Sequence, residues 1–357
     1  MTRSKLRSLL IAGVFLTASA ACSQPQQTAE QTVEAPDQSR SVNVYTARHY
    51  ASDRAVYAQF TEQTGIEINL VEASGDLMIE RIRADGERSP ADVLVTVDAG
   101  RLWRAEQAGI LEAAPELDAQ IDTLPSALVH PGKAWFGFST RVRGIAYAVD
   151  RVDPSQITDF LDLADPAYAG RICVRSSDNV YNQSLLAALI DAIGAEAAEE
   201  WAAGIAANLA RTPQGGDTDQ IRAIAADECD VAIVNHYYAV RLERSDAPAD
   251  QEVAAATEFM IPSLGGAGSH VNISGAGLAA GAPNRAEAIE FLTFMLTAEA
   301  QRTFPELTNE YPIVPGTEYD NVILEGLSMV APSEVNVDIL GENAAEAQRI
   351  FDRVGWP

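Results

Sequence analysis

The fold prediction begins from three short apolar segments, which are VNVYT (42–46), IEINLVE (66–72) and DVLVTV (92–97). Each has the length and the β-branched composition of a β-strand. A helical stretch follows each segment, at about Asp53–Gln63, about Asp76–Ala84 and Ala99–Ala108. Strands that alternate with helices at this spacing indicate a parallel α/β sheet.

The composition is that of a folded and strongly acidic protein. The chain has 357 residues, of which 47% are hydrophobic and 21% charged, and its net charge is −26. This length suggests about two domains. The charge argues against binding to nucleic acid or to an anionic membrane surface, because both need clustered Lys and Arg. The sequence contains no GxGxxG, P-loop, GxSxG or HExxH motif.

The first 21 residues have the pattern of a secretory signal peptide. A basic start is followed by an apolar run over residues 8–21, which is shorter than the roughly 20 residues of a membrane span. Cys22 comes directly after small residues, as in a bacterial lipoprotein cleavage site, although Ser19 stands where a Leu is usual. We expect lipidation at Cys22, with ordinary cleavage after Ala20 as the alternative. Residues 23–41 have the composition of a flexible tether.

The alternation of strands and helices starts again further along the chain. Strand-like segments occur at 143–150, 171–176, 228–235 and 270–279, with helical stretches between and after them. Two α/β lobes in one secreted chain indicate a periplasmic binding protein, which closes on its ligand by a hinge motion. We expect a signal peptide (1–21), a tether (22–41), a first lobe (42–142 and 270–315), a second lobe (143–269) and a C-terminal helical segment on the second lobe (316–357).

Two further cysteines, Cys173 and Cys229, each stand at the start of a predicted strand. Adjacent parallel strands would bring them together, and paired cysteines are common in oxidising compartments. We expect a disulfide between them. The alternative is two buried free thiols, which pack like small hydrophobic side chains.

Polar aromatic residues follow three of the predicted strands. They are His49 and Tyr50, then Tyr181, and then His236, Tyr237 and Tyr238. Open α/β sheets place their ligand crevice at the carboxyl ends of strands. Each group also opens a predicted helix, whose N-terminal dipole favours a phenolate.

Phenolate is a hard oxygen donor, which suits a hard cation such as Fe³⁺. The charge of such a cation deprotonates the phenol that binds it. None of the three groups contains a Cys, which argues against zinc or copper(I). A single Tyr after a strand is more commonly a packing residue, and a Tyr-Tyr pair also suits a sugar or peptide cleft. The residues alone therefore leave these readings open.

Five longer motifs carry a family resemblance. They are VNVYTARHY (42–50), SPADVLVTVDAGRLWRAEQAGIL (89–111), GRICVRSSDNVYNQSL (170–185), PQGGDTDQIRAIAADECDVAIVNHYY (213–238) and HVNISGAG (270–277). They closely resemble the ferric-iron-binding proteins of bacterial ABC iron importers, the Fbp/FutA/Sfu group, over residue 42 to the C-terminal Gly-Trp. The resemblance implies a two-lobe type II periplasmic binding protein with transferrin-like closure.

The resemblance to tyrosine-rich members of this family also implies a ligand set. His49 and Tyr50 of the first lobe would hold iron together with Tyr181, Tyr237 and Tyr238 of the second. Coordination by the histidine varies within the group.

The same resemblance implies roles for residues around the ligands. Arg241 would compensate phenolate charge, with a solvated surface Arg as the alternative. Asp98 lies near the segment that supplies a carboxylate ligand in other branches, but four tyrosines make it unnecessary. Arg48 and Arg175 are candidates for an anion site, against structural ion pairs as the alternative. Asn235 and Asn272 are expected to cap backbone groups.

The function implied is capture of Fe³⁺, with Fe²⁺ left open, and delivery to the permease of an ABC iron importer. A synergistic anion such as carbonate is neither required nor excluded. We expect a periplasmic, lipid-anchored monomer that is not an enzyme. One rival is a binding protein of the same fold for an anionic metabolite, such as a phosphorylated sugar or phosphonate. Another is a secreted hydrolase, but His130 has no neighbouring catalytic partner in the sequence.

Overall fold

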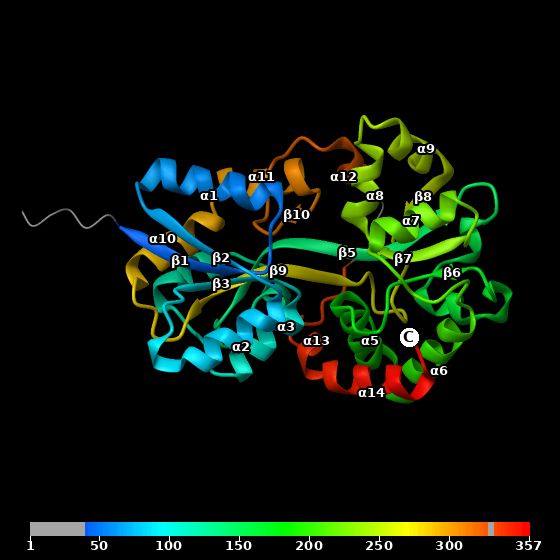
Figure 1. The fold of residues 1–357 in the computed structure, drawn as a ribbon, viewed down its shortest axis with the longest axis horizontal. Coiled ribbons are helices and arrows are strands. Elements are labelled where there is room, and N and C mark those ends of the chain that lie inside the picture. The colour runs from blue at the N-terminus through cyan, green and yellow to red at the C-terminus, as the bar shows by residue number, and fades with distance from the viewer. Residues whose placement is uncertain (1–39, 328–331) are drawn as a thin grey trace, which may run out of the picture. The chain divides into compact units, whose positions relative to one another are not determined.

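The computed structural model describes residues 40–327 and 332–357, so the predicted signal peptide, Cys22 and most of the predicted tether lie outside the described residues (Figure 1). Within them, the strands are β1 (Ser41–Thr46), β2 (Glu67–Glu72), β3 (Val93–Val97), β4 (Leu111–Glu112), β5 (Phe136–Ala148), β6 (Ile172–Cys173), β7 (Val231–Asn235), β8 (Thr257–Met260), β9 (Val271–Ala279) and β10 (Tyr311–Pro312).

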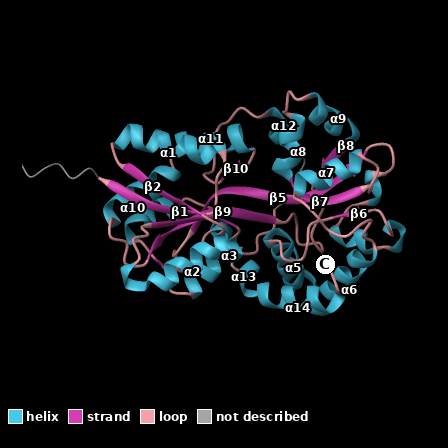
Figure 2. Ribbon diagram, in the orientation of Figure 1, coloured by secondary structure: helices cyan, strands magenta, loops and turns pink. Residues whose placement is uncertain are grey.

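The α-helices of the described residues lie on both faces of the sheet that these strands form (Figure 2). They are α1 (Ala51–Thr64), α2 (Gly75–Asp85), α3 (Ala99–Gln107), α4 (Asp118–Ile121), α5 (Val180–Ile193), α6 (Ala195–Ala207), α7 (Asp217–Ala225), α8 (His236–Glu243), α9 (Pro248–Ala256), α10 (Arg285–Met295), α11 (Ala298–Thr308), α12 (Val322–Gly326), α13 (Ile339–Glu342) and α14 (Ala344–Val354). None of these helices is long and apolar enough to cross a membrane.

The sheet is mixed, with the strand order β2-β1-β3-β9-β5-β7-β6. β1 pairs in parallel with β2 and β3, and β6 pairs in parallel with β7. The central pairings of β3 with β9, β9 with β5, and β5 with β7 are antiparallel. The three strands from which the sequence predicts a parallel sheet, β1, β2 and β3, pair in parallel as predicted, and the antiparallel pairings lie in the part of the sheet that other segments form. These central neighbours are far apart in the chain, since α5, α6 and α7 lie between β5 and β7, and further helices separate β5 from β9 and β3 from β9.

Strand β5 joins the two halves of the sheet. Its first part, up to Val142, pairs with β9, and its second part, from Arg143, pairs with β7 and β8. The strand predicted at 143–150 therefore starts earlier, at Phe136. The first part of this strand was not recognised in the sequence because two charged residues, Arg141 and Arg143, interrupt its apolar pattern. In the structure both of these side chains are buried. The strands that pair with β5 change between Val142 and Arg143, which is also where the sequence predicts the boundary between the lobes. The division into two lobes itself stays a prediction.

The C-terminal segment contacts helices of both halves. α13 packs against α3 and α5, and α14 packs against α5 and α6. A Cβ atom at Gly341 would lie 2.4 Å from the ring of Trp103, so glycine is what allows α13 to approach α3 this closely. The segment predicted on the second lobe thus also contacts the helix that follows β3.

A disulfide joins Cys173 to Cys229, with their Cα atoms 5.9 Å apart. Cys173 is the last residue of β6, and Cys229 lies just before β7. In the register of this parallel pair Cys173 lies opposite Ala232, and Cys229 lies three residues before that position. The disulfide therefore fastens the strand that leads toward Tyr181 to the strand that leads toward Tyr237.

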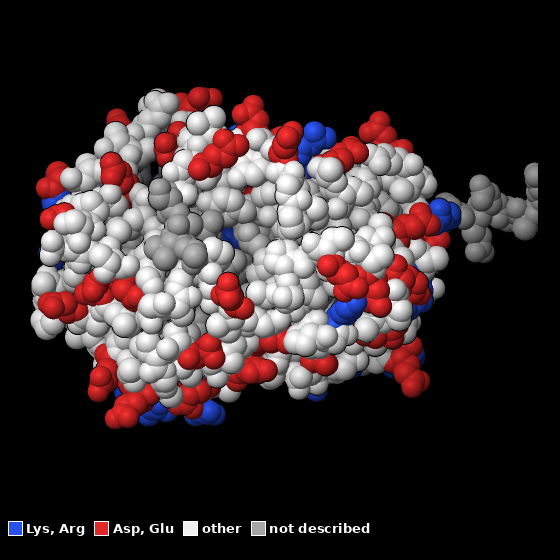
Figure 3. All heavy atoms as spheres, turned by 180° about the vertical axis from the view of Figure 1, so that it is seen from behind, with Lys and Arg blue, Asp and Glu red and all other residues white. Residues whose placement is uncertain are grey.

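Acidic side chains of the described residues are scattered over the face drawn in Figure 3, and basic side chains form no continuous patch there. Many of the described cations are paired with acids, for example Arg285 with Glu112 and Glu116. This distribution agrees with the overall net charge of −26. The described residues on this face form no basic surface of the kind that a nucleic acid needs.

Candidate metal centre

Three segments bring four tyrosines together. Tyr50 is the N-cap of α1, Tyr181 is in the first turn of α5, and Tyr237 and Tyr238 are in the first turn of α8. The hydroxyl of Tyr237 donates to that of Tyr181 over 3.3 Å. The ring centre of Tyr237 lies 6.4 Å from that of Tyr50 and 4.3 Å from that of Tyr238. The predicted tyrosines thus form one cluster.

Local hydrogen bonds fix two of the helix starts that carry these tyrosines. The backbone N–H of Tyr50 donates to the carboxylate of Asp53 over 3.0 Å. The backbone N–H of Tyr181 donates to the side-chain oxygen of Asn179, the N-cap of α5, over 3.1 Å. Both are capping interactions that satisfy a free amide at the start of a helix. They hold the phenols of Tyr50 and Tyr181 in place through the backbone.

A cleft of about 730 Å³ opens onto Tyr50, Tyr181 and Tyr238. His49 is exposed and lines the same cleft, and its ring centre lies 5.7 Å from that of Tyr50. Tyr237 lies deeper, with 3% of its surface exposed. The structure therefore places the predicted histidine at the cleft wall beside the cluster, and Tyr237 behind the phenols that line the cleft.

Arginines surround the phenol rings. Their guanidinium carbons lie over ring centres at 4.8 Å for Arg48 and Tyr50, 5.2 Å for Arg141 and Tyr181, 5.6 Å for Arg175 and Tyr181, and 4.9 Å for Arg241 and Tyr238. A cation this close favours the charged form of a phenol. Arg241 also lines the cleft. Its side chain is exposed, and the role that the sequence predicts for it stays a prediction.

In the absence of a metal, burial keeps the phenols of Tyr50, Tyr237 and Tyr238 protonated. It raises the pKa of Tyr50 well above its ordinary value, and the neighbouring phenols Tyr181 and Tyr238 raise it further. Burial and its tyrosine neighbours raise the pKa of Tyr237 in the same way. The pKa of Tyr238 is also raised, by burial first and then by Tyr181. Several phenolates can coexist here only when a polyvalent cation is shared between them.

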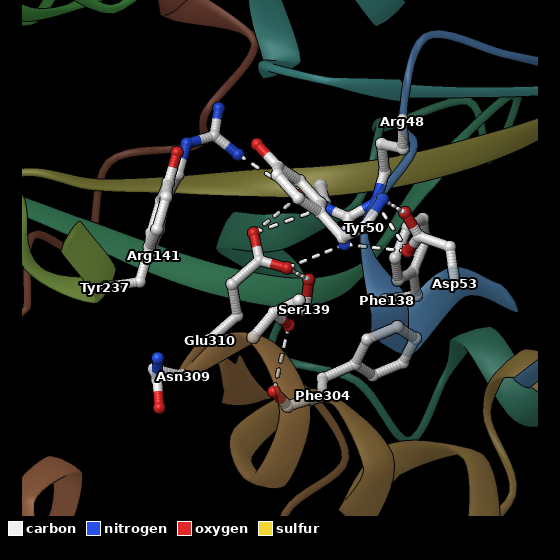
Figure 4. A network of polar contacts seen from close by, with 12 residues as sticks. Arg48, Tyr50, Asp53, Phe138, Ser139, Arg141, Tyr237, Phe304, Asn309 and Glu310 are labelled. Atoms are coloured by element: carbon white, nitrogen blue, oxygen red, sulfur yellow. Dashed lines mark hydrogen bonds and ion pairs between the residues drawn. The ribbon is translucent and has the colours of Figure 1, made fainter. Parts of the chain in front are cut away.

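Beneath Tyr50 lies a buried charge network (Figure 4). The guanidinium of Arg48 donates to Asp53 over 2.9 Å and to Glu310 over 2.8 Å. Burial opposes the charge on Arg48, but the two carboxylates outweigh it and raise its pKa. Burial likewise opposes the charge on Glu310, but Arg48 lowers the pKa of this carboxyl below its ordinary value. The N–H donors of Arg48 are therefore used in ion pairs with Asp53 and Glu310. This is the structural role that the sequence analysis named as the alternative to an anion site.

Asp98 is not free to bind a metal. Its side chain is fully buried and accepts hydrogen bonds from the backbone N–H of Gly100 over 3.0 Å, from Ser184 over 2.7 Å and from Asn272 over 2.9 Å. Its backbone has a φ of 82°, a conformation that is costly for a residue with a side chain. The strained and fully bonded Asp98 orders the start of α3 and does not face the cleft.

Asn235 and Asn272, the two asparagines predicted to cap backbone groups, have different hydrogen-bond partners. Asn272 accepts from the backbone N–H of Ala99 over 3.0 Å, which is the expected backbone cap. Asn235 instead accepts from Arg143 over 3.0 Å, and its amide lies 3.4 Å from the hydroxyl of Tyr237. The prediction that Asn235 caps the backbone is therefore wrong. Its side chain is drawn to the buried charge of Arg143 and to the phenol.

Sequence reasoning missed three charged residues behind the tyrosines, namely Arg141, Arg143 and Glu310. All three are at least 98% buried. The signal for the arginines was the alternation TRVR (140–143), because residues two apart in a strand point to the same side. Two like charges on one side of a buried strand indicate partners behind it.

The donor set of the cluster consists of phenol oxygens. Within residues 40–327 and 332–357, no three His, Cys, Asp or Glu side chains gather in an arrangement that could hold a metal ion. His130, the residue weighed for a hydrolase, accepts from the backbone of Ala134 and lies 3.9 Å from Asp338. The chemistry that the cluster offers is binding of a hard cation, with charge supplied as phenol protons leave.

Residues 88–333 match the model of a family described as bacterial extracellular solute-binding protein. The chain belongs to this family. It is 43% identical to iron uptake protein A2 of Synechocystis over 99% of both chains. A solved structure of a Trichodesmium protein (IdiA, FutA) in complex with iron and citrate ligands has 46% identity and a TM-score of 0.83, covering 89% of this chain and 100% of that one.

Apo FutA2 of Synechocystis PCC6803 has 44% identity to this solute-binding protein and a TM-score of 0.82, covering 90% of this chain and 100% of that one. These relatives confirm the resemblance found in the sequence motifs. They also confirm the predicted fold class, a type II periplasmic binding protein.

Proposed function

We propose that this protein captures Fe³⁺ outside the cytoplasm through the phenolates of Tyr50, Tyr181, Tyr237 and Tyr238. The observation that carries the proposal is the meeting of four phenols from three segments, ringed by arginines, beside an open cleft. Four phenolates on Fe³⁺ leave one negative charge, which the nearby guanidinium groups offset. The iron in the solved Trichodesmium relative supports the same cargo.

The arrangement of the phenols supports an order of events. Tyr181, Tyr237 and Tyr238 come from the predicted second lobe, and iron meets this set first. Closure of the lobes then brings Tyr50, with His49 beside it as a fifth donor, and excludes water from the metal. Opening of the lobes by the permease of an ABC iron importer releases the ion.

Further parts of the proposal concern the surroundings of the site. Arg175 is partly exposed, lines the cleft and lies over Tyr181, so it is placed to bind a small anion that accompanies the metal. The protein acts as a monomer without an enzymatic step. Lipidation at Cys22 would keep it at the membrane close to the permease.

The test is a titration with ferric nitrilotriacetate, followed by visible absorbance. Phenolate bound to Fe³⁺ gives a charge-transfer band, which we expect in the natural protein and expect to lose in the double variant Tyr181→Phe, Tyr237→Phe. Tyr57→Phe is the matched control, because Tyr57 is a buried tyrosine on α1 that packs against Phe291. A band that survives the double variant unchanged would overturn the assignment.

A further inference from the structure

Helix α8, which carries Tyr237 and Tyr238, is attached at both ends to the turn after α11. At its start, His236 accepts at Nδ1 from the backbone N–H of Val142 over 3.1 Å. Its Nε2 lies 2.7 Å from the carbonyl oxygen of Asn309. Because a backbone N–H can only donate to Nδ1, the proton of the neutral ring is on Nε2 and is donated to Asn309. At the other end, Arg244 donates to the side-chain oxygen of Asn309 over 2.6 Å.

The next residue along the chain serves the other tyrosine segment. Glu310 holds the guanidinium of Arg48, which lies over the ring of Tyr50 (Figure 4). Two consecutive residues therefore carry separate contacts. Asn309 binds the helix of Tyr237 and Tyr238, and Glu310 binds the arginine that supports Tyr50.

The turn itself is held firmly. Asn309 is 5% exposed and has a left-handed backbone, with φ of 61°. Its side-chain oxygen accepts a second bond, from Asn321, over 3.0 Å. The ring of His236 stacks on that of Tyr311, with 4.9 Å between ring centres. A residue held in this way transmits a displacement on one side to the other instead of absorbing it.

We propose that Asn309 and Glu310 form a rigid connection that sets the distance between Tyr50 and the pair Tyr237 and Tyr238. In this proposal His236 is the positioning residue that attaches the pair to Asn309. The inference rests on the proposed function, since the spacing matters only when the phenols share one ion. His236 is not itself a ligand, because it is fully buried and both ring nitrogens are engaged by backbone groups.

The experiment compares His236→Leu and His236→Gln with the matched control Asn208→Leu. Asn208 is 3% exposed and donates two bonds to backbone carbonyls, of Leu163 and Asp165. Replacing Asn208 therefore removes two buried hydrogen bonds that do not involve the four tyrosines. Each variant is titrated with ferric nitrilotriacetate at a temperature where circular dichroism shows it folded.

We expect His236→Leu to bind iron about tenfold more weakly, the effect of about one lost buried hydrogen bond, with a shifted charge-transfer band. His236→Gln keeps an N–H that reaches Asn309 and stays within about threefold of the natural protein. Asn208→Leu keeps the natural affinity and band. The inference is overturned if His236→Leu keeps the natural iron affinity and charge-transfer band. It is also overturned if Asn208→Leu loses as much iron affinity as His236→Leu does.

A second variant covers the case in which His236→Leu does not fold. Arg244 is exposed, so Arg244→Met removes the other attachment of α8 to Asn309 at little risk to folding. We expect it to bind iron about threefold more weakly, and unchanged binding overturns the inference. A natural protein without any ferric band would instead refute the proposed function.

Discussion

Binding of iron by this cluster should release protons, and the number of protons reports the number of phenolates. Burial and mutual repulsion raise the pKa values of Tyr50, Tyr237 and Tyr238, so these phenols enter the reaction protonated at pH 7. Each phenol that coordinates the metal gives up one proton. These three phenols therefore release about three protons when they become phenolates, and at a fixed concentration of free Fe³⁺ they make the logarithm of the affinity fall by about three for each unit that the pH is lowered.

The assay is isothermal titration calorimetry at pH 7 in buffers with different enthalpies of ionisation. The natural protein and Tyr238→Phe are titrated from one stock of ferric nitrilotriacetate. The protons taken up by the released chelator are the same in both and cancel in the difference. We expect the variant to release about one proton fewer for each ion bound.

Tyr57→Phe controls for the loss of a buried hydroxyl and should release as many protons as the natural protein. A difference of zero between the natural protein and Tyr238→Phe, with both binding iron, would contradict coordination of iron by a Tyr238 phenolate. It would mean that Tyr238 stays protonated in the complex. The pH dependence of its affinity would then have to come from other groups.

Three further predictions follow from individual contacts. The disulfide links cysteines 56 residues apart, so replacing both with Ala should lower the free energy of unfolding by about 4 kcal/mol in urea titrations, and a loss below about 1 kcal/mol would contradict the loop-entropy reasoning. Arg241→Gln should weaken iron binding about threefold without changing stability, because one charge over Tyr238 is lost, and unchanged affinity would rule out that role. Burial raises the pKa of Asp338 to about 6, so the folded state binds this proton more tightly than the unfolded state does, and the natural protein should lose stability relative to Asp338→Asn as the pH rises through 6. Parallel melting curves at pH 5 and 8 measure this, and a constant difference in Tm would refute it.

The sequence indicated the tyrosine segments because they follow a general rule. Tyr50 and Tyr237 each come shortly after a strand, and strand ends in open α/β sheets meet at the ligand crevice. The approach of Cys173 to Cys229 followed from the same kind of reasoning about neighbouring parallel strands. In both cases the relevant signal is local, since a strand and the residue after it are adjacent in the chain.

The charge network was not predictable in this way. Arg48 is bound by Glu310, which is 262 residues further along the chain. No local pattern connects these two residues. Their segments meet through the tertiary fold, in which β1 and β10 belong to one sheet through β3, β9 and β5, and α1 packs against α11. A separation of 73 residues likewise hid the link between His236 and Asn309. Buried polar pairs of this kind depend on the tertiary fold, whereas strand and helix patterns depend on neighbours.

A crystal structure of the iron-loaded protein, with anomalous scattering measured at the iron edge, would show directly whether the four tyrosines hold the metal. We expect one strong anomalous peak within bonding distance of the phenol oxygens of Tyr50, Tyr181, Tyr237 and Tyr238. A peak bound by carboxylates elsewhere, or one that contacts fewer than three of these oxygens, would contradict the account.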